Sequence, residues 1–175
     1  QEGSSLKGQI KQHTNPDGIV GGTSIQRFIM NSLADGACRE LIREPDGEEK
    51  CFNLISCYFE AIQEVFANAW IDRTPKSSRL VHGAGVVSMG YVMEFLYARD
   101  KAMTKEDFVT GILPLKDCTA WVSGEWYFGD NETRPWNGIQ NLHRDIQMLA
   151  SYLTRSLKRA GIARVVPIKS ETTST

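Results

Sequence analysis

The stretch KSSRLVHGAGVVSMGYVMEFLYA, residues 76–98, decides the fold. Within residues 80–96 only three residues are polar: His82, Ser88 and Glu94. A helix that is apolar nearly all round must be enclosed by other elements, and spanning a bilayer takes about 20 mostly apolar residues without such interruptions. The sequence therefore predicts a mainly α, helical bundle-like domain around a buried central helix at about residues 78–98, with Ser77 or Ser78 as its N-cap.

Two features of this helix need an explanation from its surroundings. Gly83, Gly85 and Gly90 each cost about 1 kcal/mol relative to alanine in a helix, so we expect them to admit another backbone or to mark a break near the helix start. Glu94 requires a partner if it is buried. Arg79, Arg27 or a tryptophan N–H are the partners expected from the sequence.

Bulk composition limits the classes of protein. The chain has 175 residues, of which 41% are hydrophobic, and a formal net charge of −1. This is one domain, or a domain with a trailing segment, and too apolar for a disordered chain. With so small a net charge, binding to nucleic acid or membrane requires a local patch. We find no signal peptide or transmembrane run and expect a cytoplasmic protein. The start at Gln1 suggests a fragment with its N-terminal part missing.

The cysteine and histidine patterns point away from metal sites. The four cysteines contain no CxxC pair, which disfavours a zinc site, and the chain is long for a disulfide framework. We expect buried free thiols in a reducing compartment. The three histidines and the scattered carboxylates predict no metal cluster, and we expect no cofactor.

Apolar periodicity and capping signals predict the remaining helices. They lie at residues 23–35, 37–44, 48–70, 104–113 and 139–160. Thr23 with Gln26, Asp46 with Glu49, and Thr104 with Asp107 are the expected capping pairs, Pro114 ends the fourth helix, and Gly161 is the expected C′ residue of the last.

The rest of the chain is expected to be irregular. Residues 1–22 form a polar lead-in, loose or in a short extended piece, and the helical domain covers residues 23–160. Residues 115–138 form an irregular loop with three of the four tryptophans, which is either a platform on which bases stack or a lid that closes the core. Residues 161–175 are expected to hold a short extended piece at 165–168 and a disordered Ser/Thr tail.

Local charge gives the first candidate site. Between residues 134 and 169 the chain has seven cations and a single acid, Asp145. The cations are Arg134, Arg144, Arg155, Lys158, Arg159, Arg164 and Lys169. They either stabilise the C-terminus of the last helix and solvate its outer face, or form a patch that contacts phosphates.

A second candidate is an anion or nucleotide pocket. The segment GIVGGTS, residues 18–24, precedes a helix start whose free N–H groups attract anions, although it lacks the P-loop spacing. His82 follows Arg79 closely, but HGAGVV is neither GxGxxG nor part of a hydrolase motif. The pocket residues would be Gly21, Gly22, Thr23, Arg79 and His82. The alternative is that His82 is a hydrogen-bonded structural residue.

Residues KSSRLVHGAGVVSMGYVME and GIVGGTSIQRFIMNSLADG resemble the C-terminal part of bacterial DGQHR-domain proteins, a group that includes the DndB-like proteins of DNA phosphorothioation systems. The resemblance covers most of residues 8–160 and implies a helical region of a bacterial cytoplasmic protein linked to DNA modification, transcription regulation or phage defence. In that family the Asp-Gly-Gln-His-Arg motif lies in an N-terminal portion. It is absent here, so no activity is assigned through it.

Three functions follow as hypotheses. The preferred one is a non-enzymatic module that assists DNA binding or regulation through Arg144, Arg155, Lys158, Arg159 and Arg164. The second is a fragment of a nucleotide-processing enzyme whose site is completed by the missing N-terminal part. The third is a dimerisation module whose buried helix packs against another chain, so the expected partners are DNA, the remainder of the full-length chain, or a second copy.

Overall fold

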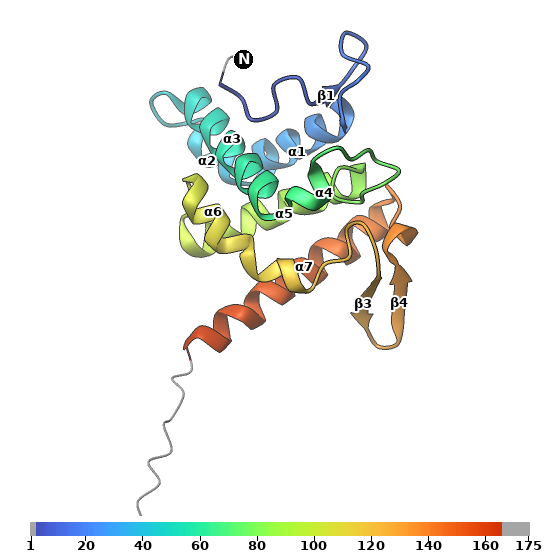
Figure 1. Ribbon diagram of the computed structural model, residues 1–175. Helices are drawn as coiled ribbons and strands as arrows, with labels where there is room; N and C mark the ends of the chain where they lie inside the picture. The colour runs from blue at the N-terminus through green and yellow to red at the C-terminus, as the bar shows by residue number, and fades with distance from the viewer. Residues whose placement is uncertain (1–2, 166–175) are drawn as a thin grey trace, which may run out of the picture.

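The computed structural model describes residues 3–165, with side chains to residue 161 (Figure 1). This part of the chain is mainly α and has two very small sheets. The helices are α1 (Gly22–Asp35), α2 (Ala37–Leu41), α3 (Gly47–Val65), α4 (Ala67–Trp70), α5 (Gly83–Asp100), α6 (Lys105–Ile112), α7 (His143–Val165) and the 3-10 helices η1 (Leu113–Asp117) and η2 (Trp136–Gly138). The strands are β1 (Ile10–Lys11), β2 (Val20–Gly21), β3 (Glu125–Gly129) and β4 (Glu132–Pro135).

Helix α5 is the buried centre, as the sequence predicts. It packs against α1 and α7, and also contacts α2 and α6. Its buried residues surround the helix and include Val86, Met89, Val92, Met93 and Leu96. Helices of its own chain therefore cover most of the apolar surface of α5. The dimerisation module stays a hypothesis.

The start of α5 differs from the prediction. His82, rather than Ser77 or Ser78, is the N-cap, and its Nδ1 accepts a hydrogen bond from the N–H of Ala84 at 3.2 Å. A Cβ on Gly85 would lie 1.9 Å from the carbonyl oxygen of Arg79. The chain therefore folds back against the first turn instead of adding a turn to it. Gly85 admits another stretch of backbone, as expected, whereas Gly90 admits the ring of Phe28.

Several predicted helix ends are also wrong. Helix α1 begins at Gly22 with Gly21 as N-cap and no side-chain cap, because β2 leads directly into it; the predicted Thr23–Gln26 capping box does not form. Asp46 does precede α3, but in the left-handed conformation with φ 58° and without a side-chain cap. The helix expected at 48–70 is interrupted at Phe66, whose φ of −113° and ψ of 39° separate α3 from α4.

The start of α6 confirms the capping box predicted from the sequence. Thr104 is the N-cap, and a reciprocal capping box with Asp107 is complete. Pro114 ends the α-helix, but it lies in the first turn of η1, where its missing N–H costs no hydrogen bond.

The tryptophan-rich segment is more regular than predicted. Strands β3 and β4 form an antiparallel hairpin, and Asp130 and Asn131 at its turn have positive φ, a conformation that these two residue types tolerate. Trp121 and Trp126 are 3% and 1% exposed, with ring centroids 5.0 Å apart. Their burial favours the lid over the base-stacking platform for this pair.

Helix α7 is displaced toward the C-terminus relative to the prediction of 139–160. Its first residue is His143, and it passes through Gly161 to Val165. Gly161 is therefore inside the helix and is not a C′ residue. Val165 belongs to α7, and the remainder of the expected extended piece and the Ser/Thr tail lie outside the described residues.

The lead-in lies against α3. Leu6 is buried, and the Ser5 N–H donates to Ser56 Oγ at 3.1 Å. Strands β1 and β2 pair in parallel, which is the short extended piece of the prediction. All four cysteines are free thiols, and Cys38 and Cys51 are the buried pair. Along residues 3–165, the helices are all too short or too polar to cross a bilayer.

Candidate functional site

The outer face of α7 gathers most of the predicted basic residues. Arg144, Arg155, Lys158 and Arg159 are all exposed, and they lie opposite the buried residues Ile146, Leu149, Leu153 and Leu157. At about 100° per residue, Arg155 is three turns from Arg144 on the same side, with Lys158 and Arg159 one turn further on. The four cations extend along about 22 Å of one helix face. We call this surface the α7 basic face.

The helix dipole does not explain the α7 basic face. The favourable effect on cations falls off within the last turn of a helix, and α7 continues to Val165. Arg155, Lys158 and Arg159 all precede that turn. Arg144 is the second residue of α7, where the positive end of the dipole disfavours a cation. The longer helix thus removes the helix-dipole explanation and leaves solvation of the outer face as the structural alternative.

Among the described side chains, no carboxylate neutralises the α7 basic face. Over residues 3–161, none of its four cations forms an ion pair. Arg155 Nε donates to the Ser151 carbonyl of its own helix at 3.3 Å. Lys158 Nζ lies 5.7 Å from the centroid of the Phe95 ring, which holds the side chain against α5 while leaving its charge in solvent.

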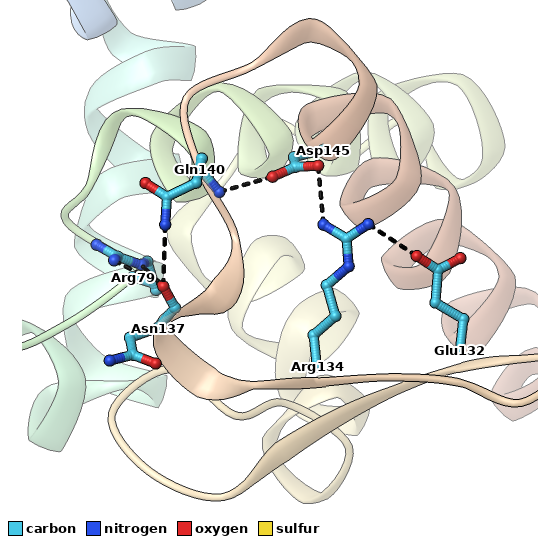
Figure 2. Close-up of polar contacts among 6 residues, drawn as sticks. All are labelled: Arg79, Glu132, Arg134, Asn137, Gln140 and Asp145. Atoms are coloured by element: carbon cyan, nitrogen blue, oxygen red, sulfur yellow. Dashed lines mark hydrogen bonds and ion pairs between the residues drawn. The ribbon is translucent and has the colours of Figure 1, made fainter.

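Arg134 belongs to a separate structural network. Its guanidinium donates to Asp145 Oδ1 at 2.9 Å and to Glu132 Oε1 at 2.8 Å (Figure 2). Asp145 is 2% exposed, and its Oδ2 accepts from the Gln140 N–H at 2.8 Å. The single acid of the basic segment is therefore occupied in joining the hairpin to α7. Because Asp145 is the single acid among these cations, the sequence could have suggested that it pairs with one of them.

Arg164 lies in the last turn of α7, beyond the residues whose side chains are described. Its part in the predicted patch stays a prediction.

The predicted nucleotide pocket is not assembled as expected. Gly21, Gly22 and Thr23 line a cavity of about 700 Å³ together with Ile10 and Met30, and neither Arg79 nor His82 lines it. The guanidinium of Arg79 donates instead to the carbonyls of Pro75 and Asn137, as Figure 2 shows for Asn137. Arg79 thus holds the loop before α5 against η2.

His82 has a structural environment. Its Nδ1 is occupied as the N-cap acceptor of α5, so the neutral ring carries its proton on Nε2. Burial, followed by the neighbouring charge of Arg79, lowers the pKa of His82 below its ordinary value. A neutral, capping imidazole is what the structural alternative predicts.

The hydrogen-bond partner of Glu94 is not one of those expected from the sequence. Its Oε2 accepts a hydrogen bond from the Ala37 N–H, the first donor of α2, at 2.7 Å. Arg79 donates to other carbonyls, Arg27 is exposed, and the indole N–H groups of Trp70 and Trp126 donate elsewhere. A backbone N–H at a helix start cannot be identified as a partner from residue types alone.

Comparison of the chain with protein-family models, curated proteins and solved structures finds no match in any of the three.

Proposed function

We propose that this chain is a non-enzymatic helical module that assists DNA binding, with the α7 basic face contacting backbone phosphates. Arg144, Arg155, Lys158 and Arg159 supply the charge. Arginine and lysine bind phosphate oxygens through charge-assisted hydrogen bonds, and such contacts position a protein on DNA without reading its sequence.

The observation that carries the proposal is the charge of the exposed side of α7. The sequence of α7 contains a single acid, Asp145, and this residue is buried and paired with Arg134. Four exposed cations that form no ion pair with the side chains described are a local concentration of positive charge on a chain whose net charge is −1. The C-terminal turns of α7 project beyond the other helices in Figure 1, so a duplex can approach them.

The setting of this activity comes from the resemblance to DGQHR-domain proteins. It suggests a cytoplasmic bacterial protein associated with DNA modification or phage defence, in which another part of a longer chain supplies any catalysis. DNA, the remainder of that chain and a second copy are the partners in this proposal.

The test is fluorescence anisotropy with a labelled duplex at low salt, comparing two triple variants of equal charge. One replaces Arg155, Lys158 and Arg159 by alanine. The control replaces Arg27 of α1 and the turn residues Arg43 and Lys76, which are all exposed. Both variants lose three positive charges, so a general loss of charge affects them equally.

We expect the first variant to lose at least about tenfold in affinity, which corresponds to about 1.4 kcal/mol, and the control to bind like the original chain. Equal losses in both variants would mean that only net charge matters. Unchanged binding by the first variant would make the α7 basic face ordinary surface.

A further inference from the structure

Glu94 has one carboxylate oxygen with a partner and one without. Oε2 accepts from the Ala37 N–H at 2.7 Å. Oε1 is buried, and it has no hydrogen-bond partner among the described residues. A buried acceptor left without a donor is unfavourable, so a donor from outside the chain would stabilise this oxygen.

The backbone around α2 fixes the position of this carboxylate. A Cβ on Gly36 would lie 2.5 Å from the Glu94 carboxyl carbon, so the group sits directly against the junction of α1 and α2. Ser32 Oγ accepts from the next amide, that of Cys38, at 3.1 Å. The backbone N–H groups of Ala37 and Cys38 are thus already used by Glu94 Oε2 and by Ser32.

A cavity of about 340 Å³ opens beside the carboxylate, between α1 and α5. This is several times the space of one water molecule, about 30 Å³. Glu94 lines it together with two aromatic residues, Phe28 and Tyr91, and the polar residues Asn31, Ser32 and Asp35. Asp35 is exposed and pairs with Arg39 at 3.0 Å, so Glu94 is the lining carboxylate that lacks a cation.

We propose that this cavity binds an organic cation, with a primary ammonium or a guanidinium group donating to Glu94 Oε1. A cationic donor forms a stronger hydrogen bond to a carboxylate than a neutral donor does. Aromatic rings in the lining attract cations through their π faces. A metal ion fits less well, because no cluster of three or more metal-ligating side chains occurs in the described part of the chain.

The same head group can come from a free amine or from a lysine or arginine side chain of a partner. Two probes separate these sources. Methylguanidinium represents the free cation, and a short peptide, acetyl-Gly-Arg-Gly-amide, represents the side chain. Binding of both means that a partner's arginine can enter the cavity, whereas binding of methylguanidinium alone assigns the cavity to small free cations.

The test is titration of the ¹⁵N-labelled chain with each probe at constant ionic strength, following the amide signal of Ala37 by NMR. We expect a saturable shift of this signal that sodium chloride does not reproduce. Glu94→Gln keeps an acceptor for the Ala37 N–H but removes the charge, and it should weaken binding at least about tenfold, the effect of losing one charge-assisted hydrogen bond.

Two further variants guard against a folding artefact. Asn31→Trp places a large side chain at an exposed position of α1 that lines the cavity, so it should abolish probe binding with Glu94 intact. Glu106→Gln removes an exposed acid on α6 and should bind the probe normally. A linear, non-saturable shift, or equal shifts in the original chain and Glu94→Gln, would overturn the proposal.

Discussion

Asp145 Oδ1 lies 2.9 Å from Arg134 Nη1, an ion pair that joins the start of α7 to strand β4. The acid is almost fully buried, whereas the other partner of Arg134, Glu132, is 48% exposed at its side chain. The buried half of this network therefore ties the start of α7, which carries Arg144 of the α7 basic face, to the hairpin.

We expect Asp145→Asn to lower the free energy of unfolding by about 1 to 3 kcal/mol, because a buried hydrogen-bonded charge is lost while an amide oxygen remains. Glu132→Gln removes the exposed partner of the same arginine and should change stability by less than about 0.5 kcal/mol. Urea denaturation of both variants checks the difference. Equal effects would contradict the importance of burial.

Two glycines in helices should respond to alanine in opposite directions. Gly85→Ala places a Cβ 1.9 Å from the Arg79 carbonyl oxygen, and we expect a loss of about 3 kcal/mol or more from this overpacking. Near Gly161 the nearest atom to an added Cβ is Arg99 Nη1 at 3.6 Å. Gly161→Ala should therefore stabilise α7 by up to about 1 kcal/mol through helix propensity.

Thermal unfolding of the two variants tests this contrast. A stabilising Gly85→Ala would mean that residues 78–81 do not fold back over α5. A destabilising Gly161→Ala would mean that α7 ends before this residue, as the sequence alone suggested.

His82 should make stability depend on pH. Its pKa in the folded chain is lowered by burial and by Arg79, so below about pH 6.5, the ordinary pKa of histidine, the unfolded chain binds more protons than the folded one. Stability should then fall as the pH decreases through this range. His82→Asn keeps a good N-cap acceptor and should remove this component.

The measurement is the difference in urea midpoint between the original chain and His82→Asn from pH 7.5 to 5.5. We expect the urea midpoint of the original chain to decrease relative to that of His82→Asn as the pH falls toward 5.5. A difference that stays constant across this range would mean that His82 has the same pKa in the folded and unfolded chains, in contrast to the prediction.

The sequence predicted the fold where the signal was local or very strong. The apolar run around Val86 to Leu96 required a buried helix, and α5 is that helix. Thr104 and Asp107 form the predicted capping box because both partners lie within one turn. The predicted first residues of α1 and α5 were wrong. These helix starts depend on β2 and on the Arg79–Gly85 contact, which local sequence patterns do not contain.

The candidate site was predictable only in part. Exposed cations on α7 follow from helical periodicity, and their number was visible in the sequence. Arg134 pairs with Asp145 and Glu132 instead of joining the patch, and this depends on the hairpin. The glycine- and tryptophan-rich composition of residues 115–138 did not predict that hairpin. The partner of Glu94 was missed because a backbone amide carries no residue-type signal.

The most direct test of the proposed function is the salt dependence of DNA binding by this chain, measured by fluorescence anisotropy. Contacts from Arg144, Arg155, Lys158 and Arg159 to four phosphates predict that the logarithm of the binding constant falls linearly with the logarithm of salt concentration, with a slope of about −3.6. Replacing Arg155, Lys158 and Arg159 by alanine should bring the slope close to about −1. No binding at low salt, or a slope that the triple substitution leaves unchanged, would contradict phosphate binding by the α7 basic face.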